Sequence, residues 1–179
     1  MTRILMSGLL IITIISAANA KEWRGIVPLH STRADVERLL GKPKQDFEGI
    51  LVEYQLSTET IDIQFAANPQ CKEEWPYSSW DVPKHTVTFI RVAPTKETFL
   101  SELKLDLSKF TKEPGDYDVP SHFYYINESD GFTVSVQEMG AGTLVGAFVY
   151  GPPSSEARLR CKPKGGFKLF PPTISFRDA

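Results

Sequence analysis

Apolar and polar positions alternate most regularly in two stretches, residues 52–56 (VEYQL) and 61–65 (IDIQF). Every second residue is apolar, and the residues between them are acidic or carry amides. A two-residue period is typical of a strand with one buried face, and the polar link at residues 57–60 predicts that the two strands form a hairpin. A third strand is expected to run from His85 towards Pro94.

A different spacing precedes these strands, in the segment STRADVERLLGKP. Val36, Leu39 and Leu40 fall on one face of a helix, so we expect all three to be buried against the strands. Thr32 and Asp35 have the spacing of a capping box, in which each side chain accepts a hydrogen bond from the backbone of the other residue. The glycine and the proline that follow end the helix after about two turns.

The same order of features recurs when the chain is compared with itself at a shift of 71 positions. Tyr54 then falls on Tyr125, and the apolar residues of the strand at 61–65 fall on apolar residues of a later alternating segment. A shift of 58 aligns the third strands, so the first copy carries about thirteen extra residues, within residues 68–84. We therefore expect an α+β fold of two tandem copies of a short helix plus a three-stranded antiparallel sheet, with either separate sheets or one continuous sheet.

The link between the two copies has a mixed pattern. Leucines and phenylalanines at residues 96–110 fit a helix, but Leu103, Leu105 and Leu107 also alternate as in a strand. We expect two short helical turns with a bend near Leu105. The predicted organisation is a first copy over residues 21–94, a second copy over 95–161 and a tail rich in glycine, proline and lysine over 162–179.

The first twenty residues have the features of a secretory signal peptide. Arg3 precedes an apolar run from Ile4 to Ile15, and Ala18-Asn19-Ala20 has the small-x-small form that signal peptidase cuts after. The apolar run is shorter than a membrane span requires. We expect export to the periplasm or the exterior, with cleavage after Ala20 and no stable membrane insertion.

The chain has two cysteines, Cys71 and Cys161, and a formal net charge of −2. In an oxidising compartment such a pair is expected to form a disulfide. Two thiols without neighbouring histidine or cysteine ligands do not complete a zinc site. The charge gives no indication of a nucleic-acid partner.

The segment STRADVERLLGKP, followed by a strand that contains a tyrosine, resembles the helix-plus-sheet module of the SmpA/BamE envelope proteins. It is also similar to the modules that beta-lactamase inhibitor proteins carry in tandem, and the opening WRGIVPLHSTRADV looks like that of a group of uncharacterised secreted bacterial proteins. The resemblance covers residues 26–66 and, more loosely, residues 99–152. It implies a binding module without catalysis, whose sheet face or loops hold another protein.

Candidates for catalysis are few. None of the histidines, His30, His85 and His122, has a second metal-ligand type at helical spacing. Ser121 and His122 are adjacent, and adjacent residues of a strand point to opposite faces. The glycines of MGAGTLVG do not have the spacing of a nucleotide-binding loop and fit a hairpin turn. We therefore predict no catalytic residue, no metal site and no cofactor.

The extra segment of the first copy contains three aromatic residues, Trp75, Tyr77 and Trp80. Tryptophan and tyrosine often anchor protein interfaces, so these residues are the candidate contacts for a protein partner that the sequence does not identify. The alternative is that the segment folds back and covers its own sheet. For the whole protein, a non-catalytic interaction module is the first interpretation, and a hydrolase with a pocket between the copies or a small-ligand carrier are the alternatives.

Overall fold

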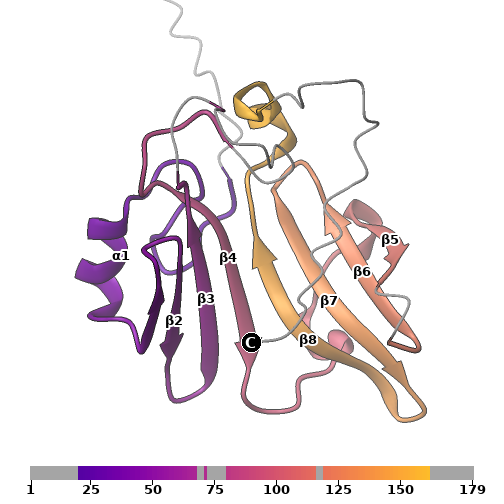
Figure 1. Cartoon of the computed structure of the whole chain (residues 1–179). Coiled ribbons are helices and arrows are strands. Elements are labelled where there is room, and N and C mark those ends of the chain that lie inside the picture. The colour runs from indigo at the N-terminus through magenta and orange to yellow at the C-terminus, as the bar shows by residue number, and fades with distance from the viewer. Residues whose placement is uncertain (1–19, 68–70, 72–79, 116–118, 162–179) are drawn as a thin grey trace, which may run out of the picture.

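Strands form at both of the alternating stretches and at six further segments, and they join into one antiparallel sheet. The computed structural model describes residues 20–67, 71, 80–115 and 119–161. Its eight strands are β1 (Gln45–Phe47), β2 (Leu51–Gln55), β3 (Glu59–Phe65), β4 (Val87–Pro94), β5 (Thr111–Pro114), β6 (His122–Asn127), β7 (Phe132–Met139) and β8 (Gly142–Tyr150). Their spatial order is β1-β2-β3-β4-β8-β7-β6-β5, so two four-stranded meanders meet where β4 pairs with β8 (Figure 1).

The expected fold of two copies, each with a helix and three strands, is wrong. Within the described residues α1 (Arg33–Leu40) is the one α-helix, and the corresponding part of the second half forms two 3-10 turns, η1 (Leu100–Leu103) and η2 (Leu107–Lys109). Lys104 between these turns has a left-handed backbone (φ +50°), which breaks a continuous helix near the expected bend. A third 3-10 segment, η3 (Ser154–Leu159), follows β8. The sheet also contains two edge strands that were not predicted, β1 and β5, which are short and lack an alternating apolar pattern.

The first helix forms as its cap predicts, but it buries a narrower face. The Thr32 side chain accepts a hydrogen bond from the Asp35 N–H, and the Asp35 carboxylate accepts one from the Thr32 N–H at 3.0 Å, which confirms the capping box. Val36 is fully buried and Leu40 is half-buried, whereas Leu39 is 42% exposed. The prediction for Leu39 is wrong because the helix contacts the sheet along the line through Val36 and Leu40, and Leu39 lies about 100° around the helix from Leu40.

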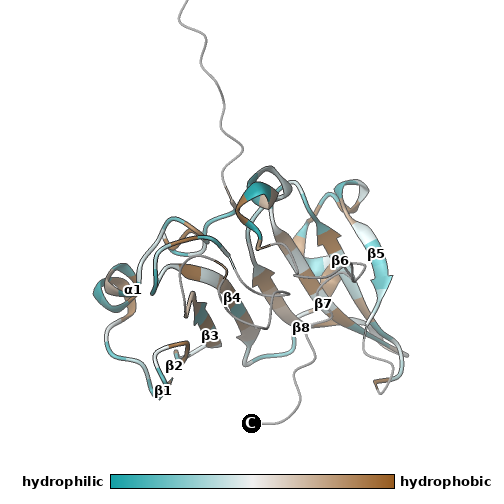
Figure 2. Ribbon diagram, turned by 45° about the horizontal axis from the view of Figure 1, so that its top comes forward, coloured by the Kyte–Doolittle hydropathy of each residue, from teal (hydrophilic) through white to brown (hydrophobic). Residues whose placement is uncertain are grey.

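One core lies on a single side of the sheet and spans both meanders. In the first half, Val36 packs with buried residues of β2, β3 and β4, and in the second half Leu100 packs with Phe132 and other residues of β7 and β8. Phe148 and Tyr150 of β8 contact both groups. Figure 2 shows this distribution: apolar residues concentrate on the central strands, and β5 is hydrophilic.

The start of the described chain also joins the two halves. Trp23 and Ile26 are buried in the first half of the core. Two residues before Trp23, the Lys21 N–H donates to the Asp130 carbonyl at 3.0 Å, and the Lys21 ammonium lies 3.6 Å from the centroid of the Phe132 ring. This segment therefore holds the β6–β7 turn of the second half against the first half.

Replacing Val36 by alanine should lower the free energy of unfolding by about 1.5 to 3 kcal/mol, because the lost methyl groups are fully buried. Leu39→Ala is the matched control on the same helix and should change it by less than about 0.5 kcal/mol. Urea unfolding of both variants measures the difference. A larger loss for Leu39→Ala than for Val36→Ala would contradict the packing described for α1.

The capping box should also make the helix sensitive to acid. Hydrogen bonds from Thr32, and then from Arg38, lower the pKa of the exposed Asp35 carboxyl from 3.8 to about 2. Since the folded-state pKa lies below the ordinary value, the stabilisation is complete above about pH 4 and is lost as the pH falls towards 2. Carboxyl NMR titration should give the lowered pKa, and Asp35→Asn should reduce the loss of stability between pH 4 and pH 2. An unshifted Asp35 would contradict the cap.

Candidate functional site

The two faces of the sheet differ in what covers them. Side chains of α1 and η1 pack on the face that carries the core. Alternation along each strand places the other side chains on the opposite face, which we call the second face. From β2 across to β6 the second face is formed by Leu51, Glu53, Asp62, Gln64, Phe89, Arg91, Ala93, Ala147, Val149, Thr133, Ser135, Tyr124 and Ile126.

The middle of the second face is apolar. Phe89 and Ala93 of β4 and Ala147 and Val149 of β8 form a strip on the two central strands, and we call these four residues the apolar strip. Ala147 is 3% exposed and Val149 is 8% exposed, although neither belongs to the core clusters on the other side of the sheet. The strands on each side contribute mainly polar residues, so the strip has a polar rim.

One charged residue, Arg91, lies within the strip, directly opposite Val149, and further charged residues lie beside it on β3 and β2. Arg91 lies between Phe89 and Ala93 along β4, and its guanidinium is 3.0 Å from the Asp62 carboxylate on β3. Asp62 lies directly opposite Glu53 of β2, and two like charges in that position repel each other. Glu53 has its own cation, because the Lys44 ammonium is 2.8 Å from its carboxylate. All of these side chains are partly exposed, so the pairs orient the charges more than they stabilise the fold.

On the opposite side of the strip, His122 contacts Ser135 and not the neighbouring Ser121. The distance between His122 Nε2 and Ser135 Oγ is 2.8 Å, and the His122 ring packs edge-on against Tyr124. A Cβ atom on Gly115 would overlap the His122 ring, so this position requires glycine. A serine and a histidine at this distance have the spacing of a nucleophile and its general base. Ser135, however, lies within β7 and not on the sharp strand-to-helix turn of a hydrolase nucleophile.

The other two histidines lie elsewhere. His30 is exposed, with its Nε2 atom 3.8 Å from a Glu156 carboxylate oxygen. His85 lies two residues before β4, its carbonyl accepts a hydrogen bond from the Arg33 N–H at 2.9 Å, and its Nδ1 atom is buried without a hydrogen-bond partner. Among the described residues, no group of three or more histidine, cysteine, aspartate or glutamate side chains could hold a metal ion.

Of the three aromatic residues expected to contact a partner, Trp80 is described, and Trp75 and Tyr77 lie outside the described residues. Trp80 is buried and packs with Leu29, Ala66 and Val82 at the end of the sheet. It forms an antiparallel bridge with Arg160, whose guanidinium lies 5.4 Å from the Trp80 ring centroid. Trp80 therefore belongs to a small core of its own, and the interface role of the three-residue group stays a prediction.

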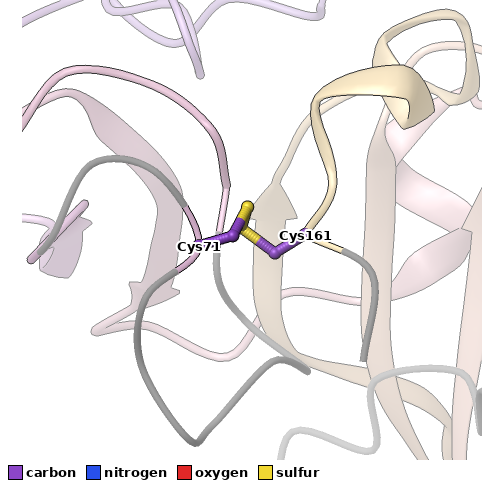
Figure 3. Close-up of a disulfide and its surroundings, with 2 residues drawn as sticks. All are labelled: Cys71 and Cys161. Carbon is purple, nitrogen blue, oxygen red and sulfur yellow. A yellow bond between two sulfur atoms is a disulfide. The ribbon is translucent and has the colours of Figure 1, made fainter. Parts of the chain in front are cut away.

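A disulfide links Cys71 to Cys161, as the sequence predicts (Figure 3). The two Cα atoms are 5.3 Å apart, and Cys161 is almost completely buried. Because Cys161 directly follows Arg160, the disulfide and the Trp80–Arg160 bridge together fix the segment after η3 to the segment before β4.

The apolar strip was not among the predicted sites, although the sequence carries a signal for it. The segments VTFIRVA in β4 and GAFVY in β8 are apolar at successive positions, and do not alternate as β2 and β3 do. Such runs are typical of strands that are covered on both faces. Since one face carries the core, the second face of these two strands is where a cover is expected.

Comparison with known proteins does not assign a function. No protein-family model and no curated protein sequence matches the chain. A crystal structure of a DUF4309 family protein (YjgB) from Bacillus subtilis is similar with a TM-score of 0.46 and 12% sequence identity, over 75% of this chain and 88% of that chain. A likeness at this level shows neither a shared family nor a shared activity. Within the described residues, no helix is long and apolar enough to cross a membrane.

Removing the disulfide should lower the free energy of unfolding by about 4 to 5 kcal/mol on the chain-entropy estimate, because the bond closes a loop with a sequence separation of 90. Urea unfolding of Cys71→Ser, of Cys161→Ser and of the double variant should show similar losses of the free energy of unfolding. Reduction of the wild type should lower its free energy of unfolding by the same amount. Intact mass with and without alkylation checks the oxidation state. Two free thiols in the denatured, unreduced protein would overturn the assignment.

Proposed function

We propose that this protein is an exported, non-catalytic module that binds another protein through the second face of its sheet. The observation that carries the proposal is the apolar strip, with polar side chains around it and no described helix packed on it. An apolar centre with a polar rim is the usual organisation of a protein–protein interface. The disulfide supports export, since such bonds persist in oxidising compartments.

The size of the second face also favours a protein over a small ligand. Strands lie about 4.8 Å apart and advance about 3.3 Å per residue. The face across β1 to β5 is therefore about 34 Å wide, and strands of three to nine residues, about six on average, make it roughly 20 Å long. The resulting area of about 700 Å² is close to the roughly 800 Å² that each partner contributes to a standard interface.

Site-specific photocrosslinking tests the proposal. A benzophenone side chain at Gln64 or at Thr133 would lie on the second face, one on each side of the apolar strip. Arg38 on α1 and Lys109 on η2 are exposed positions away from this face and serve as matched controls. In cells that export the protein, we expect both second-face positions to crosslink to the same protein and the two controls to give no adduct with it.

Two results would contradict this proposal. One is an equal yield of adducts from all four positions, which would indicate non-specific collision. The other is the absence of any protein adduct from Gln64 and Thr133 when Arg38 or Lys109 gives one, which would place the interface on the α1 side.

A further inference from the structure

The apolar strip raises the question of what covers it before a partner binds. An open sheet face with an apolar centre is prone to aggregation in a free protein. Ala147 and Val149 are buried and the strand sequences have the pattern of two-sided cover. Since Ala147 and Val149 are buried in the chain alone, the cover has to come from within the chain.

The position of Cys161 shows where the described chain ends relative to the second face. Ala66 directly follows Phe65 of β3, whose side chain is in the core, so the Ala66 side chain is on the second-face side. Trp80 and Leu159 pack on Ala66, and the disulfide holds the following segment in this place. Cys161, the last described residue, therefore lies near the end of β3 and the start of β4, beside the second face.

The length of this last segment is sufficient for it to reach across the strip. Residues 162–179 number eighteen, and an extended chain of that length reaches about 60 Å. β8, the longest strand, has nine residues and extends about 30 Å. The segment can therefore run along β4 and β8 and turn back.

The composition of the segment suits the strip. Phe167 and Leu169 alternate around Lys168, and Ile174 and Phe176 alternate around a serine, so each pair can place two apolar side chains on one side. The two prolines between these pairs favour a change of direction. The segment has four cationic residues, Lys162, Lys164, Lys168 and Arg177, and one acidic residue, Asp178. The rim carries the carboxylate of Glu113 on β5 and those of Glu53 and Asp62, which already form ion pairs with Lys44 and Arg91.

From these observations we infer that residues 162–179 dock on the apolar strip of their own sheet and cover it until a partner displaces them. Docking follows from the position, length and composition of the segment. The competition with a partner rests on the function proposed above. The segment would then act as an internal competitor for the binding face.

Methyl NMR with a soluble paramagnetic relaxation agent tests the docking directly. Residues 21–179 are compared with a truncated chain, residues 21–164, which keeps both cysteines. On truncation, the relaxation enhancement at the Ala147 and Val149 methyl groups should rise at least threefold. The methyl groups of Ile63 and Val134, which lie in the core, should not change and show that the sheet is still folded.

A third variant separates sequence-specific docking from a general effect of an added tail. It carries residues 165–179 in scrambled order and should leave Ala147 and Val149 as accessible as in the truncated chain. Equal accessibility of these methyl groups in the full-length and truncated chains would overturn the inference, as would equal protection by the scrambled tail.

Photocrosslinking of the truncated chain from Thr133 distinguishes the two proposals. A higher yield of the partner adduct than from the full-length chain supports the competition. If truncation exposes the Ala147 and Val149 methyl groups but Thr133 gives no protein adduct, the docking is supported and the proposed function is rejected. If truncation changes neither the yield of the partner adduct nor the relaxation enhancement at the Ala147 and Val149 methyl groups, the proposed function is supported and the docking is rejected.

Discussion

The pairing of β4 with β8 is the interaction on which the rest of the structure depends. Three residue pairs, from Ile90↔Tyr150 to Val92↔Phe148, form the seam between the two meanders. Phe148 and Tyr150 project from this seam into both parts of the core. Without the seam, each half would be a four-stranded sheet with an unpaired inner edge and half of a core, and exposed edges of that kind favour aggregation.

The seam also creates the candidate site. Because β4 and β8 are the two central strands, both of their faces lie far from the edges of the sheet, and apolar residues can occupy both faces. On one face these residues form the middle of the core, and on the other they form the apolar strip. Arg91 of β4, which lies opposite Val149 and forms an ion pair with Asp62 of β3, interrupts the strip at one position.

Local signals predicted local structure correctly. The capping box at Thr32 and Asp35, the hairpin of β2 and β3, and the bend near Leu105 could all be read from residues close together in the sequence. The exposure of Leu39 could not, because the width of a buried helix face depends on what it packs against, and α1 lies near the edge of the sheet. The edge strands β1 and β5 were missed since strands exposed on both sides have no apolar period to detect.

Local sequence patterns could not predict which side chains of different strands lie next to each other on one face of the sheet. That Val149 lies opposite Arg91 follows from a pairing between strands almost sixty residues apart, and short patterns do not specify such a pairing. The same holds for His122, which contacts Ser135 across the β6–β7 hairpin and not its neighbour Ser121. The disulfide was predictable because two cysteines leave one possible bond within the chain.

The disulfide encloses most of the sheet and leaves the beginning of the chain outside. β4 to β8 lie between Cys71 and Cys161, whereas α1 and β1 to β3 precede Cys71. In a chain that crosses a membrane from its N-terminus, Cys71 emerges as a free thiol well before Cys161 does. The bond therefore forms only after β8 has emerged, and at that moment β4 can meet β8. The disulfide can therefore form only in a chain in which all eight strands are available for pairing.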